Sequence, residues 1–419
     1  MDAMYISVEV RFDSLRGDPM SRSILVFFFC ASFFLANAHT LLAQARTQYF
    51  PDTSDGIHLE MVFNYNVNNP EIEAGRVDMV WGSNYSTRPA GVYNTSYIPY
   101  SVDNYTRNVG WYRQNHPDWL EYLCDRKTLA FEFGATNLAP IDFANPAVQA
   151  YQWSNWVDRP IAQGFGGIAV DTMSASSNWG RCGHFDLSGN WVQQYSGALK
   201  DSVYQRDELQ WEAATYNHVH HYSPTATMQV NVSYEFGYSR AVNLKLMTTA
   251  DLLFDERGFS NYGSPPDVPT PGQWQDIVDV LQLVQSKGVC YMTNGEESEI
   301  TSDIPQSARL WVIANYLLVK NNCTYMYIIG FLVNGGQGYG SLFIFPEYSI
   351  PIGYATGNMT QTQGVWERTF TGGLALVNPY LETATVTLPA GSYVDVNGNP
   401  VDSPVTLEKQ TAQVLLNAP

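Results

Sequence analysis

From about residue 57, the chain alternates short apolar runs with amphipathic stretches of helical period. Apolar runs of this length between turn residues are typical of buried strands. We interpret eight runs as strands, at 58–64, 77–83, 128–134, 166–171, 227–233, 250–256, 287–293 and 323–329. Alternating β and α elements with buried strands predict a parallel sheet covered by helices. Eight such units favour closure into a (β/α)₈ barrel, an α/β fold, over an open sheet.

Three of the stretches between these runs carry clear helix signals. One is predicted over 145–162, because its Asn-Pro start supplies a cap and a proline in the first turn. A second is predicted over 274–288, where apolar residues share one face and a Lys-Gly pair marks the end. A third is predicted over 305–321, which repeats apolar residues at helical spacing.

Near residue 366, the pattern changes to short alternating strands separated by turn residues. This texture predicts a small antiparallel β-sandwich over 366–419. The preceding stretch, 331–365, is rich in glycine and is expected to connect the two parts. The predicted domains are therefore a barrel over 46–350 and a C-terminal sandwich.

The first 45 residues are typical of a secretion signal. Arg22 precedes an almost wholly apolar run over 24–36, and small-residue cleavage patterns follow at 36–38 and 43–45. The run is short for a membrane span, although an N-terminal anchor is the alternative. We expect an extracellular or periplasmic protein with no membrane contact after signal removal.

Four cysteines follow the predicted signal, and an exported protein can oxidise them. Cys124 and Cys182 both lie in expected loops, which favours a bridge between them. Cys290 lies in an apolar strand and is interpreted as a small buried hydrophobe. The sequence alone does not give the connectivity of these residues with Cys323.

The net charge is −18, from 40 acidic and 22 basic residues. A nucleic-acid partner requires a basic surface, so this class of protein is excluded. The net charge neither attracts nor repels a neutral glycan. The chain is also rich in aromatic residues, most of which are expected in the core, while some could stack on sugar rings.

Candidate chemistry lies where barrel strands end, because the active face of a (β/α)₈ barrel is at the carboxyl ends of its strands. In the fourth predicted strand, alternation places Gly167, Ala169 and Asp171 on one face. Small residues fit a crowded barrel interior, so Asp171 is expected at the mouth. The alternative is a structural aspartate that caps the next turn.

The sixth predicted strand ends in adjacent Asp255 and Glu256, which cannot both point inward. Periodicity alone does not choose between them. Two carboxylates facing each other across a barrel mouth are what glycoside hydrolysis requires. Asp171 and one of these two residues are therefore the candidate catalytic pair.

Other polar or aromatic residues near strand ends are candidates for binding substrate. In the fifth predicted strand, Asn231 is expected to face the mouth, where its amide could bind a sugar hydroxyl. Each candidate has a plain alternative as a loop or cap residue. The full set comprises Asn64, Tyr65, Trp81, Asn84, Glu132, Asp142, Asn231, Asp255, Asn294, Glu296 and the neighbouring Glu297.

No cofactor or metal is expected. His218, His220 and His221 form a small cluster, but we place it in a helix-to-strand loop on the side opposite the active face. The sequence contains no glycine-rich phosphate loop, serine nucleophile elbow or HExxH motif. The predicted partner is a carbohydrate substrate. No sequence pattern indicates the oligomeric state.

Several motifs together resemble a known family. They are IDFANP (141–146), GGIAVDT (166–172), DLLFDERGF (251–259), PEYSIPIG (346–353) and RTFTGGLALVNP (368–379). Over residues 57–419 the chain resembles the hypothetical glycoside hydrolase-like family fifteen. The last motif, at the expected join between barrel and sandwich, is the most specific.

The resemblance implies a barrel with a C-terminal sandwich and a polysaccharide-related role. Together with the secretion signal, it predicts a secreted glycoside hydrolase that takes part in polysaccharide breakdown, with retention of configuration as one option. It selects Glu256 over Asp255, with Asp171 and Glu256 placed like the nucleophile and acid/base of α-galactosidase-type barrels. One departure is Arg257, which stands between Glu256 and Gly258 where the family has Glu-Gly. The alternatives are a non-catalytic glycan-binding or structural barrel, and a metal-dependent hydrolase or deacetylase.

Overall fold

The computed structural model describes residues 48–419 except 64–71, 73, 84–89, 104–105, 176–177, 233–239, 257, 261–267, 298–303, 333–335 and 338–343. It describes only the backbone at 294–297, 329–332 and 336–337. The predicted secretion signal lies outside the described residues. Within them, no helix combines the length and the apolar character needed to cross a bilayer.

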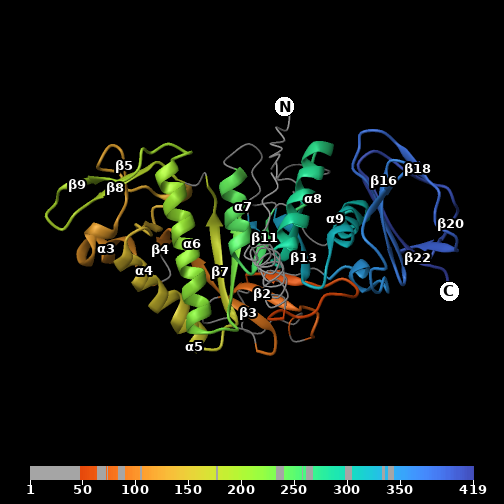
Figure 1. The fold of residues 1–419 in the computed structure, drawn as a ribbon, viewed down its shortest axis with the longest axis horizontal. Helices are drawn as coiled ribbons and strands as arrows, with labels where there is room; N and C mark the ends of the chain where they lie inside the picture. Colours follow the sequence, from red (N-terminus) through yellow and green to blue (C-terminus); the bar gives the residue numbers. More distant parts are fainter. Residues whose placement is uncertain are drawn as a thin grey trace, which may run out of the picture. The chain divides into compact units, whose positions relative to one another are not determined.

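The described part of the chain contains the predicted barrel of eight parallel strands (Figure 1). Each strand pairs in parallel with the next in the ring. A parallel bridge between Leu59 and Met326 joins the last strand to the start of the first. The strands in ring order are β1 (Glu60–Val62), β2 (Met79–Ser83), β3 (Tyr93–Pro99), β7 (Gly167–Met173), β10 (Thr227–Val232), β11 (Leu252–Asp255), β12 (Cys290–Glu297) and β13 (Thr324–Leu332).

The third barrel strand is β3, so its predicted position at 128–134 was wrong. The run at 128–134 has three consecutive apolar residues, 129–131, before Glu132, whereas β3 carries Asn94, Thr95 and Ser96 in a row, which hides its apolar alternation. The barrel accommodates these polar groups: the Asn94 amide donates to the Val92 carbonyl at 2.9 Å. Residues 128–134 instead end in a short 3₁₀ helix, η3 (Glu132–Gly134).

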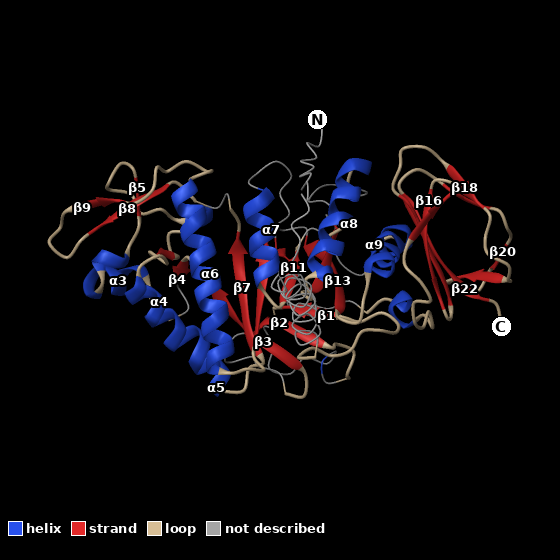
Figure 2. Cartoon of the chain, in the orientation of Figure 1, coloured by secondary structure: helices blue, strands red, loops and turns tan. Residues whose placement is uncertain are grey.

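Helices cover the outside of the barrel strands from β7 to β13 (Figure 2). The three predicted helices are all present. The first consists of three consecutive segments, and its cap is the Asn145 side chain, which accepts from the Ala147 N–H. The helices are α4 (Pro146–Gln152), the π-helical η4 (Trp153–Asp158), α5 (Arg159–Ala162), α6 (Ser202–Tyr222), α7 (Arg240–Thr249), α8 (Pro271–Ser286) and α9 (Gln306–Val319).

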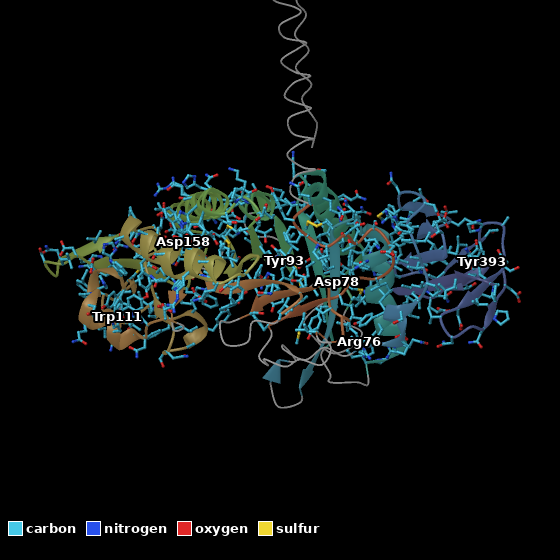
Figure 3. All side chains as sticks on the ribbon, turned by 90° about the horizontal axis from the view of Figure 1, so that it is seen from below. Arg76, Asp78, Tyr93, Trp111, Asp158 and Tyr393 are labelled. Carbon is cyan, nitrogen blue, oxygen red and sulfur yellow. A yellow bond between two sulfur atoms is a disulfide. The ribbon has the colours of Figure 1, made fainter. Side chains whose placement is uncertain are left out.

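Glycines make room where β7 meets its neighbours. A Cβ atom at Gly167 would lie 2.0 Å from the Thr227 carbonyl oxygen of β10, and one at Gly166 would lie 2.5 Å from the Tyr93 ring. The Tyr93 hydroxyl donates to the Gly166 carbonyl at 2.8 Å (Figure 3 labels Tyr93). The GGIAVD sequence therefore reflects close packing of β7 against β3 and β10.

A lobe projects from the loops that follow β3 and β7. We define the lobe as the described residues of 100–145 and 178–201. A buried arginine, Arg181, forms ion pairs with Glu121 and Glu132 and ties the two segments together. The elements of the lobe are β4 (Val102–Asp103), α3 (Val109–Asn115), η2 (Pro117–Trp119), β5 (Tyr122–Leu123), η3, β6 (Ala139–Pro140), β8 (Arg181–Phe185) and β9 (Trp191–Gln193).

The four cysteines within the described residues form two disulfides. Cys124 is bonded to Cys182, as predicted, and this bond links the two segments of the lobe. Cys290 is bonded to Cys323, so its interpretation as a free buried hydrophobe was wrong. The two residues lie side by side because β12 and β13 are neighbours paired in register from Tyr291 and Thr324 onward.

The C-terminal region is the predicted antiparallel sandwich. A six-stranded sheet packs one face against a two-stranded sheet, and the core between them includes Leu374, Leu376, Val386 and Leu407. The elements from the connection onward are β14 (Gly336–Gln337), η6 (Pro346–Ser349), β15 (Thr360–Thr362), β16 (Val365–Phe370), β17 (Gly373–Asn378), β18 (Ala384–Val386), β19 (Tyr393–Asp395), β20 (Pro400–Val401), β21 (Val405–Leu407) and β22 (Thr411–Asn417).

The other face of the six-stranded sheet packs on α9 of the barrel. Ala375, Val377 and Val414 alternate with the sandwich core residues and belong to the hydrophobic core of the barrel. The Arg368 side chain of β16 donates to carbonyls at the end of α9, including those of Leu317 and Lys320 at 3.1 and 2.6 Å. A cation at a helix C-terminus satisfies carbonyls that have no partner within the helix.

Candidate active site

The inward face of β11 is identified by a contact across the barrel. Phe254 of β11 packs on Trp81 of β2, with ring centroids 4.9 Å apart. These strands are four apart in a ring of eight, so Phe254 points into the interior. Alternation then places Asp255 on the outer face and Glu256 on the inner face. The buried Asp255 accordingly lies 3.5 Å from the Tyr291 hydroxyl, while Glu256 lies at the mouth.

Asp171 lies at the carboxyl end of β7 and accepts hydrogen bonds from three directions. The Tyr97 hydroxyl donates to Oδ2 at 2.9 Å, and the Asn231 amide donates to Oδ1 at 2.8 Å. The Thr172 backbone N–H also donates to Oδ1, at 2.9 Å. Burial raises the pKa of Asp171, and these hydrogen bonds oppose the rise. The carboxylate is therefore held in a fixed orientation.

Asn231 joins Asp171 to Glu256. Its Nδ2 atom donates to Asp171 Oδ1 at 2.8 Å and to Glu256 Oε2 at 3.2 Å. The two oxygens that share this amide therefore lie at most about 6 Å apart, which is below the ~6.5–9.5 Å separation of the carboxyl groups in inverting glycosidases. The Asn231 Oδ1 atom is buried and accepts no hydrogen bond from any described residue. The sequence predicted that Asp171, Asn231 and Glu256 would meet at the mouth, and the structure brings these three together.

The backbone is strained directly after Asp171. Thr172 has a φ of 62°, a region that β-branched residues rarely adopt. The pairing of β7 with β10 shifts register at this point, which is a β-bulge. Strain of this kind persists where the surrounding structure enforces it, and it concentrates at functional positions.

Other predicted site residues have different surroundings. Trp81 is fully buried in the barrel interior, and its ring also contacts Phe63 and Tyr97. Glu132 lies in the lobe, where it binds Arg181 at 3.0 Å, and burial raises its pKa. Asp142 also lies in the lobe and accepts from Gln194 at 3.0 Å.

Several candidates cannot be placed. Asn64, Tyr65 and Asn84 lie outside the described residues, as does Arg257. Asn294, Glu296 and Glu297 belong to β12, but their side chains are not described. The roles of these residues stay predictions.

Tyr97 is the residue of the site that sequence reasoning missed. It lies on β3, which was not recognised as a strand. The signal is the alternation of Tyr93, Thr95 and Tyr97, which share the inward face and reach Thr227, Gln229 and Asp171 respectively.

The histidine cluster lies at the end of α6, so its placement in a loop was wrong. His218 stacks on Trp153 and binds Asp158 at 2.7 Å (Figure 3 labels Asp158). His220 binds Asp251 at 3.0 Å, and His221 is exposed. Among the described residues, no group of three or more His, Cys, Asp or Glu is arranged to hold a metal ion.

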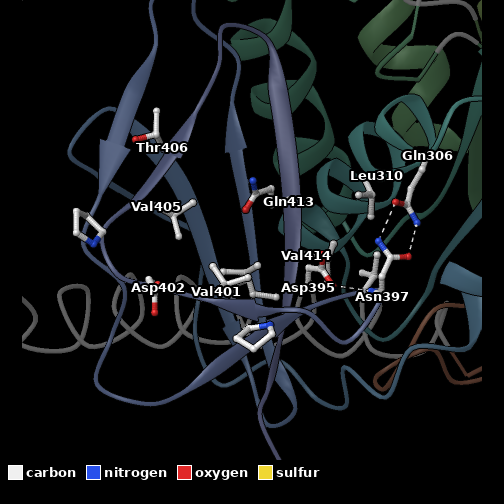
Figure 4. Close-up of a pocket in the computed structure, with 14 residues that line it drawn as sticks. Gln306, Leu310, Asp395, Asn397, Val401, Asp402, Val405, Thr406, Gln413 and Val414 are labelled. Atoms are coloured by element: carbon white, nitrogen blue, oxygen red, sulfur yellow. Dashed lines mark hydrogen bonds between the residues drawn. The ribbon is translucent and has the colours of Figure 1, made fainter.

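A separate pocket lies in the seam between α9 and the sandwich (Figure 4). Gln306 of α9 and Asn397 exchange hydrogen bonds of 3.1 Å at its edge. Asp395 and Asp402 contribute its charged groups. No aromatic ring and none of the predicted site residues line this pocket, so it forms no part of the candidate active site.

No family model and no curated protein matches the sequence. The fold defines the class: a (β/α)₈ barrel followed by a β domain, as in solved glycoside hydrolases. An α-amylase from Anoxybacillus is 12% identical, with a TM-score of 0.51 over 87% of this chain and 98% of its own. A "Family GH13_31 enzyme" is 10% identical, with a TM-score of 0.52 over 86% and 99%. Amy13B from Eubacterium rectale is 9% identical, with a TM-score of 0.50 over 88% and 97%. At these identities the similarity is one of fold, and the resemblance to family fifteen stays a prediction.

Proposed function

We propose that this protein is a glycoside hydrolase that cleaves a poly- or oligosaccharide with Asp171 and Glu256. One observation carries the proposal: a single amide, that of Asn231, donates to both carboxylates at the mouth of the barrel. Two carboxylates held this close are suited to acid-assisted cleavage of a glycosidic bond. The fold shared with solved glycosidases supports the same class.

The short separation of the carboxylates supports a retaining mechanism. An Asp171 oxygen attacks the anomeric carbon while Glu256 gives its proton to the departing glycosidic oxygen. Water then attacks the glycosyl-enzyme ester, Glu256 takes the proton from this water, and Asp171 leaves as a carboxylate. Tyr97 and the Thr172 N–H keep Asp171 in place for the attack.

The setting of this activity is a further part of the proposal. We place the enzyme outside the cytoplasm, because the N-terminal segment is typical of a secretion signal and the four cysteines after it are bonded in pairs. Starch-type glucans belong among the first substrates to test, since one solved structure of the same fold is described as an α-amylase.

The test is hydrolysis of a polysaccharide panel by three single variants. Asp171→Asn and Glu256→Gln remove the nucleophile and the proton donor, so each should lower kcat by roughly 10²–10⁴-fold. Asp255→Asn is the matched control, because Asp255 is the adjacent carboxylate on the outer face of β11. It should lose far less activity than Glu256→Gln.

Circular dichroism and melting temperatures establish that the variants are folded. If both Asp171→Asn and Glu256→Gln cleave as fast as the wild type, the assignment is wrong. A wild-type protein that binds a glycan tightly but cleaves none of the panel would instead be a glycan-binding barrel. Product stereochemistry, followed by NMR, separates retention from inversion.

A further inference from the structure

Two aromatic residues of the lobe have a backbone conformation that such residues rarely adopt. Phe133 has a φ of 50° and Trp179 a φ of 52°. Each is followed by a glycine that also has positive φ, Gly134 at 69° and Gly180 at 75°. Consecutive positive φ angles suit Asn-Gly or Gly-Gly, and a bulky side chain at the first position is strained.

The two rings pack on each other and leave an exposed apolar surface. Their centroids are 4.4 Å apart with an interplanar angle of 55°. Phe133 is 69% exposed, the most exposed aromatic ring among the large exposed hydrophobics of the described residues. Trp179 is half-buried, and its Nε1 atom has no hydrogen-bond partner among the described residues. We call Phe133 and Trp179 the aromatic platform.

The platform lies on the side of the barrel mouth where Asp171 lies. Phe133 belongs to the segment that follows β3, and Trp179 to the segment that follows β7. These strands are neighbours, and Pro99 at the end of β3 pairs with Asp171. Both segments therefore leave the active face next to Asp171. Ser101, two residues after Pro99, donates a hydrogen bond to the carboxylate of Glu132, which precedes Phe133.

The platform is also held rigidly. Arg181, two residues after Trp179, binds Glu132 and Glu121 in the buried interior of the lobe. The disulfide between Cys124 and Cys182 joins the same two segments. A rigid aromatic surface loses little conformational entropy when a ligand stacks on it.

We propose that Phe133 and Trp179 form a sugar-binding subsite, on which a pyranose ring of the bound glycan stacks beside the ring held at Asp171. The occupant is a further residue of the same glycan chain, because the two segments that carry the platform leave the barrel mouth next to Asp171. The proposal rests on the proposed function. It adds a preference for substrates longer than a disaccharide.

The experiment measures binding in the Asp171→Asn background, which lacks the proposed nucleophile, so that the oligosaccharide stays intact during the titration. The probes are maltohexaose, cellohexaose, xylohexaose and mannohexaose, with the matching disaccharides, each titrated by calorimetry. Phe133→Ala and Phe133→Asn should weaken hexasaccharide binding about tenfold, while Phe133→Tyr should retain it. Phe133→Asn should melt no lower than its parent, because asparagine tolerates positive φ.

Leu187→Asn is the matched control. Leu187 is 80% exposed and lies in the same lobe, in the turn between β8 and β9. This substitution removes an exposed apolar side chain of the lobe outside the platform, so hexasaccharide affinity should stay at the parent value.

Two results would overturn the proposed subsite: a Phe133→Asn variant that binds the hexasaccharide as tightly as its parent, or a parent that binds none of the four. Failure of the proposed function gives a different result. In that case a hexasaccharide binds in a Phe133-dependent manner, but the wild-type protein cleaves no glycan.

Discussion

Asp171 is a carboxylate under two opposing influences. Burial favours its neutral form, whereas hydrogen bonds from Asn231, Tyr97 and the Thr172 N–H favour the ionised form. A nucleophilic carboxylate has to be ionised at the working pH. In the mechanism that we propose, the hydrogen bonds therefore serve a chemical purpose as well as a structural one, because they limit the rise in the pKa of Asp171.

Tyr97→Phe tests this role at the scale of one hydroxyl group. The variant loses the hydrogen bond to Asp171 Oδ2, so the pKa of Asp171 rises further. We expect the acidic limb of the kcat/KM profile to move to higher pH, and kcat/KM at pH 5 to fall roughly tenfold or more. The measurement is kcat/KM from pH 3 to 9 on the best substrate of the panel.

Tyr93→Phe is the control on the same strand. The Tyr93 hydroxyl bonds to Gly166 and Thr227 and makes no hydrogen bond to Asp171. The acidic limb should keep its wild-type position in this variant. A Tyr97→Phe profile that overlays the wild type would show that the hydroxyl does not tune Asp171.

The sequence predicted some of these residues better than others, for physical reasons. The direction of Asp171 followed from small residues alternating with Ile168 and Val170 in one strand. The choice of Glu256 over Asp255 depended on the family resemblance. Alternation shows which residues of a strand share a face, but a reference contact is needed to show which face is the interior. That reference is the contact of Phe254 with Trp81, which joins residues 173 positions apart and is invisible in a local pattern.

At the scale of elements, the lobe is the part that local patterns described least well. Its strands contain two to five residues, and a fully buried arginine lies among them. Arg181 makes an ion pair with Glu121 and another with Glu132, and it donates to the carbonyls of Ser101 and Ile141. This network joins three segments that are distant in the sequence, so no local periodicity predicts it.

Arg181→Met should destabilise the protein by about 3–5 kcal/mol, because it leaves Glu121 and Glu132 buried without their cation. The penalty should shrink at pH 5 relative to pH 8, since a carboxyl group without its cation is more easily protonated. The measurement is the free energy of unfolding in urea at both pH values.

Arg206→Ala is the control for this substitution. The Arg206 side chain is exposed, although its partner Asp207 at 2.7 Å is buried, and the loss of an exposed arginine from an ion pair should cost about 1 kcal/mol. An Arg181→Met variant as stable as Arg206→Ala would mean that the buried network does not hold the lobe.

At the scale of the whole molecule, buried acids dominate the titration. Burial raises the pKa of Glu208 to about 7, against an ordinary value of 4.5, and it also raises the pKa of Glu121, although the Arg181 charge opposes that rise. Glu60, Glu132, Glu212 and Asp142 shift in the same direction. A folded state that holds more protons than the unfolded state loses stability as the pH rises.

We therefore expect the melting temperature to fall from about pH 5 to pH 8, by roughly 5 °C or more. Below about pH 4 it should fall again, because hydrogen bonds lower the pKa of surface acids such as Asp125 and Asp186. The measurement is thermal unfolding by calorimetry between pH 3 and pH 9.

Glu208→Gln isolates one of the groups responsible. Glu208 accepts from the Tyr100 hydroxyl at 2.9 Å and from the Ser174 N–H at 3.0 Å, and it faces the charges of Glu132 and Arg181. A glutamine oxygen can accept the same bonds without ionising, so the decline above pH 6 should be shallower. A melting temperature that rises towards pH 8 in the wild type would contradict the account.

The fold as a whole was predictable because βα alternation and the change of pattern near residue 366 are local signals. The most specific motif, RTFTGGLALVNP, proves to be architectural. Its Arg368 binds the end of α9, and a Cβ atom at Gly372 would lie 2.0 Å from the Pro351 carbonyl oxygen. The motif marks a joint between domains, so it carries information about fold more than about chemistry.

This joint limits how the gene can be cut and recombined. The sheet of the sandwich contributes Ala375, Val377 and Val414 to the barrel core. The Arg368 side chain of this sheet donates hydrogen bonds to carbonyls at the end of α9. A recombination point placed between the two domains would expose an apolar face on each fragment. The smallest portable module at this end of the chain consequently includes α9, and a chimera that exchanges the sandwich has to exchange that helix with it.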